Sequence, residues 1–142
     1  MEKPQVVLDT NVLVSALRSR RGASYRLLRL VDAGKFEVNV SVALILEYEE
    51  VGKWLCGEIG LTEKDIDDVL NYLCSISNHR AISFMWRPVL QDPDDDMLLE
   101  LAVAAGNCCI VTFNKSDFRG AEQFGVRILT PKEFLNEIKE LP

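Results

Sequence analysis

Four carboxylates in this chain stand where an oxygen-rich metal site could form. Asp9 directly follows the apolar run 6–8, and Asp117 follows a second apolar run, 108–111, within a polar loop. Ligands collect at the carboxyl ends of parallel strands, so these two positions are the first candidates. Acidic side chains that share a Mg²⁺ or Mn²⁺ ion can activate water for hydrolysis of a phosphodiester. For either aspartate alone, a helix cap or a turn is the simpler interpretation.

Glu47 is the third candidate because of its place on a predicted helix. One apolar stripe recurs there at helical spacing: Leu44, Tyr48, Val51 and Leu55. At about 100° per residue, Glu47 lies about 60° from Leu44, at the edge of the stripe. Glu49 and Glu50 lie about 140° and 120° away, toward solvent. A carboxylate at such a boundary needs a partner, and either a salt bridge or a metal ion satisfies that need.

The acidic run 92–96 supplies the fourth candidate. The helix that follows presents Leu98, Leu101, Ala102 and Ala105 on one apolar face. Asp95 lies about 60° from Leu98 and Asp96 about 160° from it, so periodicity selects Asp95. The alternative is that the run is only a helix N-terminus, where carboxylates interact favourably with the helix dipole. A calcium loop of the EF-hand type is excluded, because Met97 and Val103 stand where glycine and glutamate are required.

Composition removes several other chemistries. The chain has one histidine, His79, which excludes most schemes that use imidazole as a base or a zinc ligand. The four cysteines lack C-x-x-C spacing, and Cys108 and Cys109 lie in an apolar run, so we expect buried free thiols. The net charge of −6 argues against a broad basic surface for nucleic acid. It is compatible with carboxylates that bind a divalent cation beside a phosphate.

The elements that would position these acids alternate between strands and helices. Short apolar runs predict strands at 5–8, 36–40, 81–84, 108–111 and 126–129. Helical periodicity predicts helices at about 12–17, 22–34, 41–55, 62–76 and 97–105, and a last helix after Thr130 and Pro131. Ser41 and Thr62 are the predicted N-caps of two of these helices. Residues 112–125 are predicted to be mostly loop with one short helical turn.

Strands separated by helices favour an α/β fold. We expect a three-layer α/β/α sandwich with a parallel, doubly wound sheet of about five strands. At 142 residues the chain fits one domain, 1–142. The first apolar run is far too short for a signal peptide or a membrane span, so we expect a cytoplasmic protein without membrane contact.

Three segments, taken in order, resemble the PIN domain family. They are Val7-Leu-Asp-Thr-Asn-Val, then Asp92-Pro-Asp-Asp-Asp-Met-Leu-Leu-Glu-Leu-Ala, then Ile110-Val-Thr-Phe-Asn-Lys-Ser-Asp-Phe, with an acidic helix residue between the first two. The resemblance covers nearly the whole chain and is closest to the toxins of bacterial and archaeal toxin–antitoxin pairs. It implies an endoribonuclease that cleaves single-stranded RNA with one or two Mg²⁺ or Mn²⁺ ions as cofactor. It also implies an antitoxin protein and a second copy of the chain, in a homodimer, as partners.

Carried over residue by residue, the resemblance assigns the catalytic and metal-binding acids to Asp9, to Glu47 and to one of the run Asp94-Asp95-Asp96, within which periodicity selects Asp95. The family often has an aspartate two positions after the threonine of the fourth strand, where this chain has Asn114, and Asp117 is the substitute. In this hypothesis Asp9 and Asp95 hold the principal ion and Glu47 orients or deprotonates the attacking water. Asp117 and Asn114 support a second, weaker ion.

The remaining supporting positions are small or acidic polar residues. The threonines and the asparagine match residues that orient the acids in the family: Thr10, Asn11 and Thr112. Asp96 is a further supporting position. A basic cluster that includes Arg18, Arg20 and Arg21 would bind the RNA phosphates, with a solvated surface as the alternative.

Two other function classes stay open. A phosphotransferase with Asp9 as its nucleophile would require a second aspartate at position 11, where Asn11 stands. A catalytically weak or inactive PIN fold that serves as a binding module is the second class, and Asn114 favours it.

Overall fold

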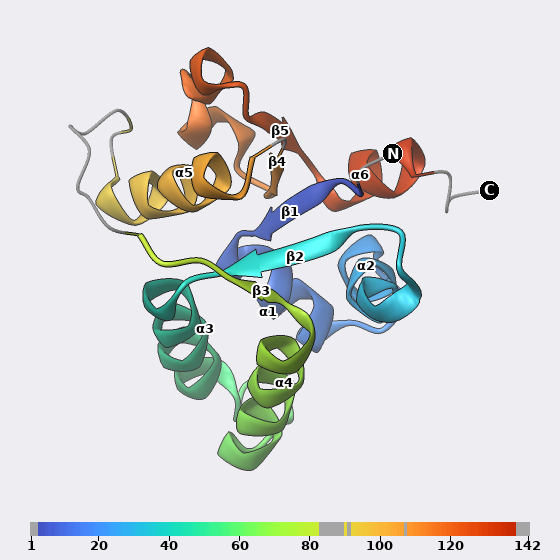
Figure 1. Ribbon diagram of the computed structural model, residues 1–142. Coiled ribbons are helices and arrows are strands. Elements are labelled where there is room, and N and C mark those ends of the chain that lie inside the picture. The colour runs from blue at the N-terminus through green and yellow to red at the C-terminus, as the bar shows by residue number, and fades with distance from the viewer. Residues whose placement is uncertain (1–2, 83–89, 91, 107, 139–142) are drawn as a thin grey trace.

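The computed structural model describes residues 3–82, 90, 92–106 and 108–138 (Figure 1). The strands are β1 (Gln5–Leu8), β2 (Glu37–Val40), β3 (Asn78–His79), β4 (Cys108–Val111) and β5 (Arg127–Leu129). The helices are α1 (Thr10–Arg18), α2 (Ala23–Arg29), α3 (Val42–Leu55), α4 (Glu63–Ile76), α5 (Pro93–Ala105) and α6 (Pro131–Glu137). Three short 3₁₀ helices are η1 (Val31–Ala33), η2 (Lys115–Phe118) and η3 (Ala121–Phe124). Within these residues no helix is both long and apolar enough to cross a bilayer.

The five strands form one parallel sheet in the order β3-β2-β1-β4-β5. The chain moves outward from β1 to β2 and β3, then returns to the other side of β1 for β4 and β5. Parallel crossovers are right-handed, so this reversal sends α5 to the face opposite α1–α4. The expected three-layer α/β/α architecture is therefore confirmed, and β1 and β4 flank its topological switch point.

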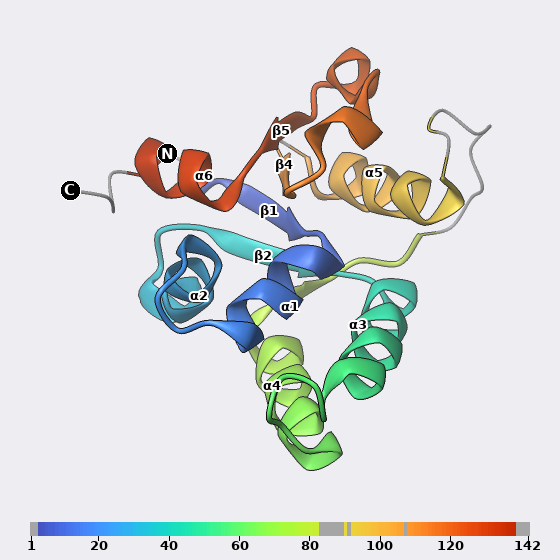
Figure 2. The ribbon, with the colours of Figure 1, turned by 180° about the vertical axis from the view of Figure 1, so that it is seen from behind.

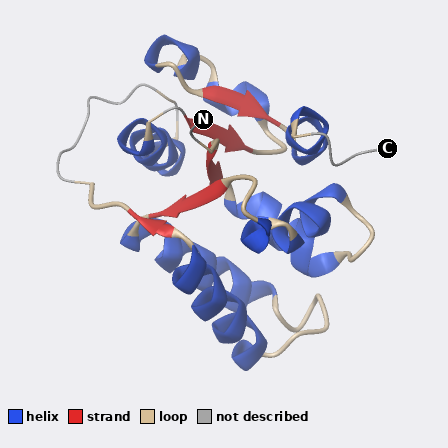
Figure 3. Ribbon diagram, turned by 45° about the vertical axis from the view of Figure 1, so that its right-hand side comes forward, coloured by secondary structure: helices blue, strands red, loops and turns tan. Residues whose placement is uncertain are grey.

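The two faces of the sheet are covered by different helices. The helix α1 lies behind β2 in Figure 1 and in front of it in Figure 2. It packs against α2 and α3, and α2 also packs against α6, whereas α5 packs on β1, β2 and β4. The strands run between these helices (Figure 3). The strands β1 and β4 are almost wholly buried, which explains why they consist of continuous apolar runs.

The predicted strand 81–84 is wrong. The third strand is β3, at Asn78–His79, whereas Ala81 and Ile82 lie outside any strand and residues 83–84 are outside the described part. Side-chain hydrogen bonds explain the difference, because Asn78 Nδ2 donates to Glu37 Oε1 (2.8 Å) and to Gln5 Oε1 (3.2 Å). Polar contacts therefore fix this edge strand, and an apolar run does not identify it.

Other elements differ from prediction mainly at their ends. The helix predicted from residue 97 begins at Pro93, where the missing N–H of proline is tolerated at the first turn. The helix predicted to reach Gly34 ends at Arg29 and continues as η1, after which Gly34 has φ of +85°. Two 3₁₀ helices, η2 and η3, replace the single turn expected within 112–125.

The predicted caps are confirmed. The Ser41 hydroxyl accepts a hydrogen bond from Leu44 N at the start of α3. Thr62 and Thr130 each form a reciprocal capping box, with Asp65 and Glu133 respectively. These local signals fix where the helices begin, and so fix which side chains face the sheet.

A buried polar network connects β1, β2 and the segment after β3. Asn39 is fully buried, and its Nδ2 donates to Gln5 Oε1 (2.9 Å) while its Oδ1 accepts from Arg80 Nε (2.9 Å). Burial of such groups is tolerated only when each finds a partner. This network therefore specifies how β3 and β2 pair beside β1.

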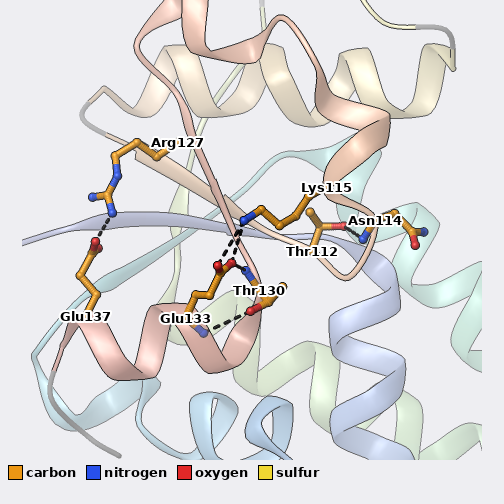
Figure 4. Close-up of polar contacts among 7 residues, drawn as sticks. All are labelled: Thr112, Asn114, Lys115, Arg127, Thr130, Glu133 and Glu137. Atoms are coloured by element: carbon orange, nitrogen blue, oxygen red, sulfur yellow. Dashed lines mark hydrogen bonds and ion pairs between the residues drawn. The ribbon is translucent and has the colours of Figure 1, made fainter.

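The loop that follows β4 is tied to the last helix. Lys115 Nζ contacts both carboxylate oxygens of Glu133 (2.9 and 3.2 Å), and Glu133 also caps its own helix at Thr130 (Figure 4). A second ion pair joins Arg127 to Glu137 further along α6. The path of the chain beyond Val111 is thus set by α6 as well as by the sheet.

Replacement of Asn39 by alanine tests the buried network. Asn39→Ala removes the buried amide that bonds to both Gln5 and Arg80, so we expect the free energy of unfolding to fall by about 1–3 kcal/mol. Urea denaturation followed by circular dichroism measures it. The exposed Asn71→Ala on α4 is the control and should change stability by less than about 0.5 kcal/mol. Equal losses for the two variants would contradict the role of the network.

Replacement of Glu133 by glutamine tests the ion pair between Lys115 and Glu133, through the pH dependence of the protein's stability. The Thr130 backbone N–H and the Lys115 ammonium hold the pKa of Glu133 below its usual value of 4.5. A lowered pKa stabilises the fold above about pH 4.5, and the contribution disappears as pH falls through the folded-state pKa. Glu133→Gln should therefore be less stable than wild type at pH 7, with a difference that shrinks below pH 4.5. The control is the exposed Glu58→Gln, measured over the same pH range. An equal pH-dependent loss in both variants would contradict the role of the Lys115–Glu133 ion pair.

Candidate functional site

The site begins where β1 and β4 end side by side. Leu8 pairs with Val111, and Asp9 N continues the ladder by donating to Val111 O (2.9 Å). The next residue of each strand therefore meets the other, and Thr112 Oγ1 donates to Asp9 Oδ2 at 2.8 Å. Two residues that are 103 positions apart are joined at the switch point of the sheet.

Asp9 carries its negative charge in an unfavourable place. Burial is the main influence and raises the pKa of this carboxyl, and the charge of Asp117 adds to the rise. The hydrogen bond from Thr112 and the backbone amides of Thr10 and Asn11 act in the opposite direction. Asp9 occupies the N-cap position of α1, and the Thr10 and Asn11 amides act on its carboxylate without the geometry of a full capping hydrogen bond. A cap alone therefore does not explain this aspartate.

Glu47 lies on α3 and is joined to the residue that follows Asp9. It is half-buried, whereas Glu50 is exposed and Glu49 forms a surface pair with Lys53. The Thr10 hydroxyl, one residue after Asp9, donates a short hydrogen bond to Glu47 Oε2. Each of two acids is thus held by a threonine hydroxyl, and both threonines are buried.

Tyr48 is a site residue that the sequence analysis placed only in the apolar stripe of its helix. Its hydroxyl donates to Leu8 O, the carbonyl that directly precedes Asp9. Burial raises the pKa of Tyr48 well above its usual value, and the charges of Asp9 and Glu47 raise it further. The phenol therefore stays protonated and fixes the end of β1. The need of a buried tyrosine hydroxyl for a partner is the signal that could have found it.

The loop after β4 contributes Asn114 and Asp117. Asn114 N donates to Thr112 Oγ1 (3.0 Å), and Asp117 N donates to Asn114 O (3.0 Å). Asn11 Oδ1 accepts a longer bond, 3.5 Å, from Phe113 N. Asp117 is exposed on η2, and its charge acts on Asp9. The structure thus brings Asp9, Thr112, Asn114 and Asp117 into one region.

The acids of the run 92–96 divide by position on α5. Asp95 is half-buried in the first turn, and its backbone N–H donates to Asp92 O (3.0 Å). Asp96 Oδ1 accepts a hydrogen bond from Leu90 N (2.9 Å), which anchors the segment that enters the helix. The helix itself packs on β1 and contacts α3. Asp96 is therefore a structural anchor, and Asp95 is the acid that periodicity selects.

The acids fit a hard divalent cation by their chemistry. Carboxylates and hydroxyls are the ligands that Mg²⁺ and Mn²⁺ prefer, and a cation would relieve the unfavourable charge of Asp9 beside Asp117. Within the residues described, no three Asp, Glu, His or Cys side chains already form a metal-binding group. The assignment of a metal ion to Asp9, Glu47, Asp95 and Asp117 therefore stays a prediction from the sequence, supported by the chemistry of these side chains.

The arginines of the predicted cluster line two separate cavities. Arg18 lines a groove of about 580 Å³ between α1 and α3, together with Thr10, Glu47 and Phe113. Arg20 and Arg21 line a separate pocket of about 540 Å³ at α2. That pocket, which we call the basic pocket, is also lined by Arg26, Arg29 and Lys132. The groove includes one candidate acid, Glu47, and the lining of the basic pocket includes none.

Comparison with known proteins gives one structural and one family result. The structure is similar to a chain in the crystal structure of VapBC2 from Rickettsia felis bound to a DNA fragment from their promoter. The TM-score is 0.60 with 14% sequence identity, and the match covers 89% of this chain and 98% of that chain. No curated protein matches significantly. At this identity the structural likeness establishes the fold.

The sequence itself supplies the family. The profile described as a PIN domain matches residues 5–116, which include both strands of the switch point and the acids Asp9, Glu47 and Asp95. On this match, the chain belongs to the PIN domain family.

Proposed function

We propose that this chain is a Mg²⁺- or Mn²⁺-dependent endoribonuclease that cleaves single-stranded RNA. The observation that carries the proposal is the pair of threonine-held acids, Asp9 with Thr112 and Glu47 with Thr10, at the switch point of the sheet. Ligands of α/β sheets bind at this place. The membership in the PIN family supports the same reaction class.

The protein's own residues would divide the work as follows. Asp9 and Asp95 would hold the principal cation, and Asp117 with Asn114 would support a second. Thr112 and the buried Tyr48 keep Asp9 in one orientation. Glu47, oriented by Thr10, accepts the proton of the attacking water. When bound, the cation supplies Lewis acidity and neutralises the charge that develops on the phosphate.

We assign the basic pocket as the binding site for RNA phosphates that do not lie at the acids. It gathers five cations in a chain of net charge −6: Arg20, Arg21, Arg26, Arg29 and Lys132. In the part of the chain that the structure describes, the ion pairs involve other cations, such as Lys53, Lys64 and Lys115. Arginine forks bind phosphate oxygens in a bidentate manner.

The biological setting that we propose is a toxin–antitoxin pair. The sequence segments resemble the toxins of such pairs, and the structural likeness to the VapBC2 structure supports this assignment at the level of the fold. An antitoxin protein and a second copy of the chain are the corresponding partners. The alternative function is a PIN fold that binds RNA or protein without cleavage, and Asn114, an amide in place of a carboxylate, favours it.

Substitution of Asp9 tests the reaction. Asp9→Asn keeps the shape of the side chain but removes the charge, so Mn²⁺-dependent cleavage of a fluorogenic single-stranded RNA should fall to background. Glu47→Gln should lower the rate roughly 10²–10⁴-fold, as for loss of a general base. The matched control is Glu50→Gln, an exposed glutamate on the same helix, which should cleave normally. Full cleavage by Asp9→Asn would reject the assignment, and RNA binding without any cleavage by wild type would favour the binding module.

Salt dependence tests the basic pocket. Affinity for single-stranded RNA is measured by anisotropy in the Asp9→Asn background, which prevents cleavage. Removal of two phosphate contacts in Arg20→Ala plus Arg21→Ala should weaken binding and reduce the slope of log K against log salt by about 1.4. Lys35→Ala plus Lys64→Ala, two exposed lysines elsewhere, should leave the slope unchanged. An unchanged slope in the arginine variant would exclude the basic pocket from RNA binding.

A further inference from the structure

The groove between α1 and α3 starts at Glu47 and leads away from it. Thr10 and Glu47, which hydrogen-bond to each other, form one end. Arg18 and Leu55 line it eight residues further along each helix. Eight residues advance a helix by about 12 Å, so the groove extends roughly that far from the acids. Figure 2 shows α1 and α3 on the same side of the sheet, with α1 between α2 and α3.

The walls of this groove are largely apolar. Val14 from α1 and Val51 with Leu55 from α3 line it, and they are all only half-buried. The charged groups stand at its two ends, Glu47 at the acids and Arg18 at the far end. A flat uncharged group therefore fits the middle of the groove, with a negative group close to Arg18.

Phe113 adds an aromatic ring to this groove, and the fold does not need it there. It directly follows the buried Thr112, yet 49% of it is exposed, and it is not part of the hydrophobic core. Its backbone N–H is directed to Asn11 Oδ1, so its place is tied to the start of α1. A large apolar side chain that is exposed beside the proposed catalytic acids is better explained by a ligand than by packing.

We propose that the α1–α3 groove is a nucleobase site in which one unpaired base of the RNA stacks on Phe113. This inference rests on the proposed ribonuclease function and names how its substrate is held. The base lies against Val14 and Val51, and a phosphate of the same strand binds Arg18. The volume of about 580 Å³ is within the range of small-ligand sites, about 300–1,000 Å³.

The chemistry of the groove favours a base over other parts of a nucleic acid. An apolar wall does not bind phosphate, whereas every base has a π-face that stacks on an aromatic ring. Bases of a duplex are already stacked and paired, so only an unpaired base can enter. The site therefore selects single-stranded RNA next to the scissile bond.

Abasic substitution in the RNA, combined with mutation of Phe113, tests the proposal. Single-stranded RNAs with one abasic nucleotide at successive positions are compared with the intact RNA. In wild type, kcat/KM should fall roughly 5- to 100-fold at one position near the cleaved bond. Phe113→Ala should lose a similar factor on the intact RNA and become insensitive to that abasic position. Phe113→Tyr should behave as wild type.

A binding measurement keeps this result separate from the reaction itself. In the Asp9→Asn background, Phe113→Ala should weaken RNA binding by a similar factor, and Arg18→Ala should reduce the salt slope by about 0.7. The control is Phe124→Ala, an aromatic of comparable exposure (42%) on η3. Cleavage with unchanged abasic sensitivity in Phe113→Ala would overturn the nucleobase site and leave the ribonuclease standing. That outcome would also be expected if the groove binds only a protein partner. Binding that depends on Phe113 without cleavage by wild type would overturn only the ribonuclease.

Discussion

The hydrogen-bonded pairing of β1 with β4 is the contact on which the candidate site depends. It places the residues that follow the two strands opposite each other, so that Asp9 meets Thr112 although they are far apart in the sequence. A shift of one residue in this pairing would move Thr112 away from Asp9. The same pairing also sets the positions of Phe113 and Asn114 and the start of η2. The contact of Asp9 with Thr112, the place of Phe113 in the groove and the path of the loop toward α6 thus all depend on one strand register.

Neutral hydroxyl groups then hold the acids without neutralising them. Thr112, Thr10 and Tyr48 each donate a hydrogen bond near the sheet edge, to Asp9, Glu47 and the Leu8 carbonyl respectively. A lysine or arginine in their place would stabilise the fold by pairing with the carboxylates, but it would compete with a metal ion. Burial together with the charge of Asp117 raises the pKa of Asp9, so the anion is kept at a cost in stability. Such a carboxylate has an unsatisfied preference for a cation.

The sequence predicts those parts of the fold that local patterns determine. Buried apolar runs predict β1 and β4, and the capping residues Ser41 and Thr62 predict where α3 and α4 begin. The predicted position of the third strand is wrong because β3 depends on side-chain contacts of Asn78 with distant residues, which no local pattern encodes. For the site too, local patterns predict some residues, and contacts with distant segments determine the others. Helical periodicity is sufficient to single out Glu47, but the roles of Tyr48 and Phe113 depend on which segment lies opposite them.

The distribution of charge explains how an acidic chain could act on a polyanion. Carboxylates near the sheet edge would repel phosphate without a divalent cation, so cleavage and binding there would be coupled to metal in the proposed function. In the proposed function the basic pocket would attract the phosphates, and its lining does not include these acids. The groove between α1 and α3 is lined by Glu47, and in our proposal it would contact an uncharged base of the substrate. This separation lets attraction of the strand, placement of a base and reaction at the phosphate use different residues.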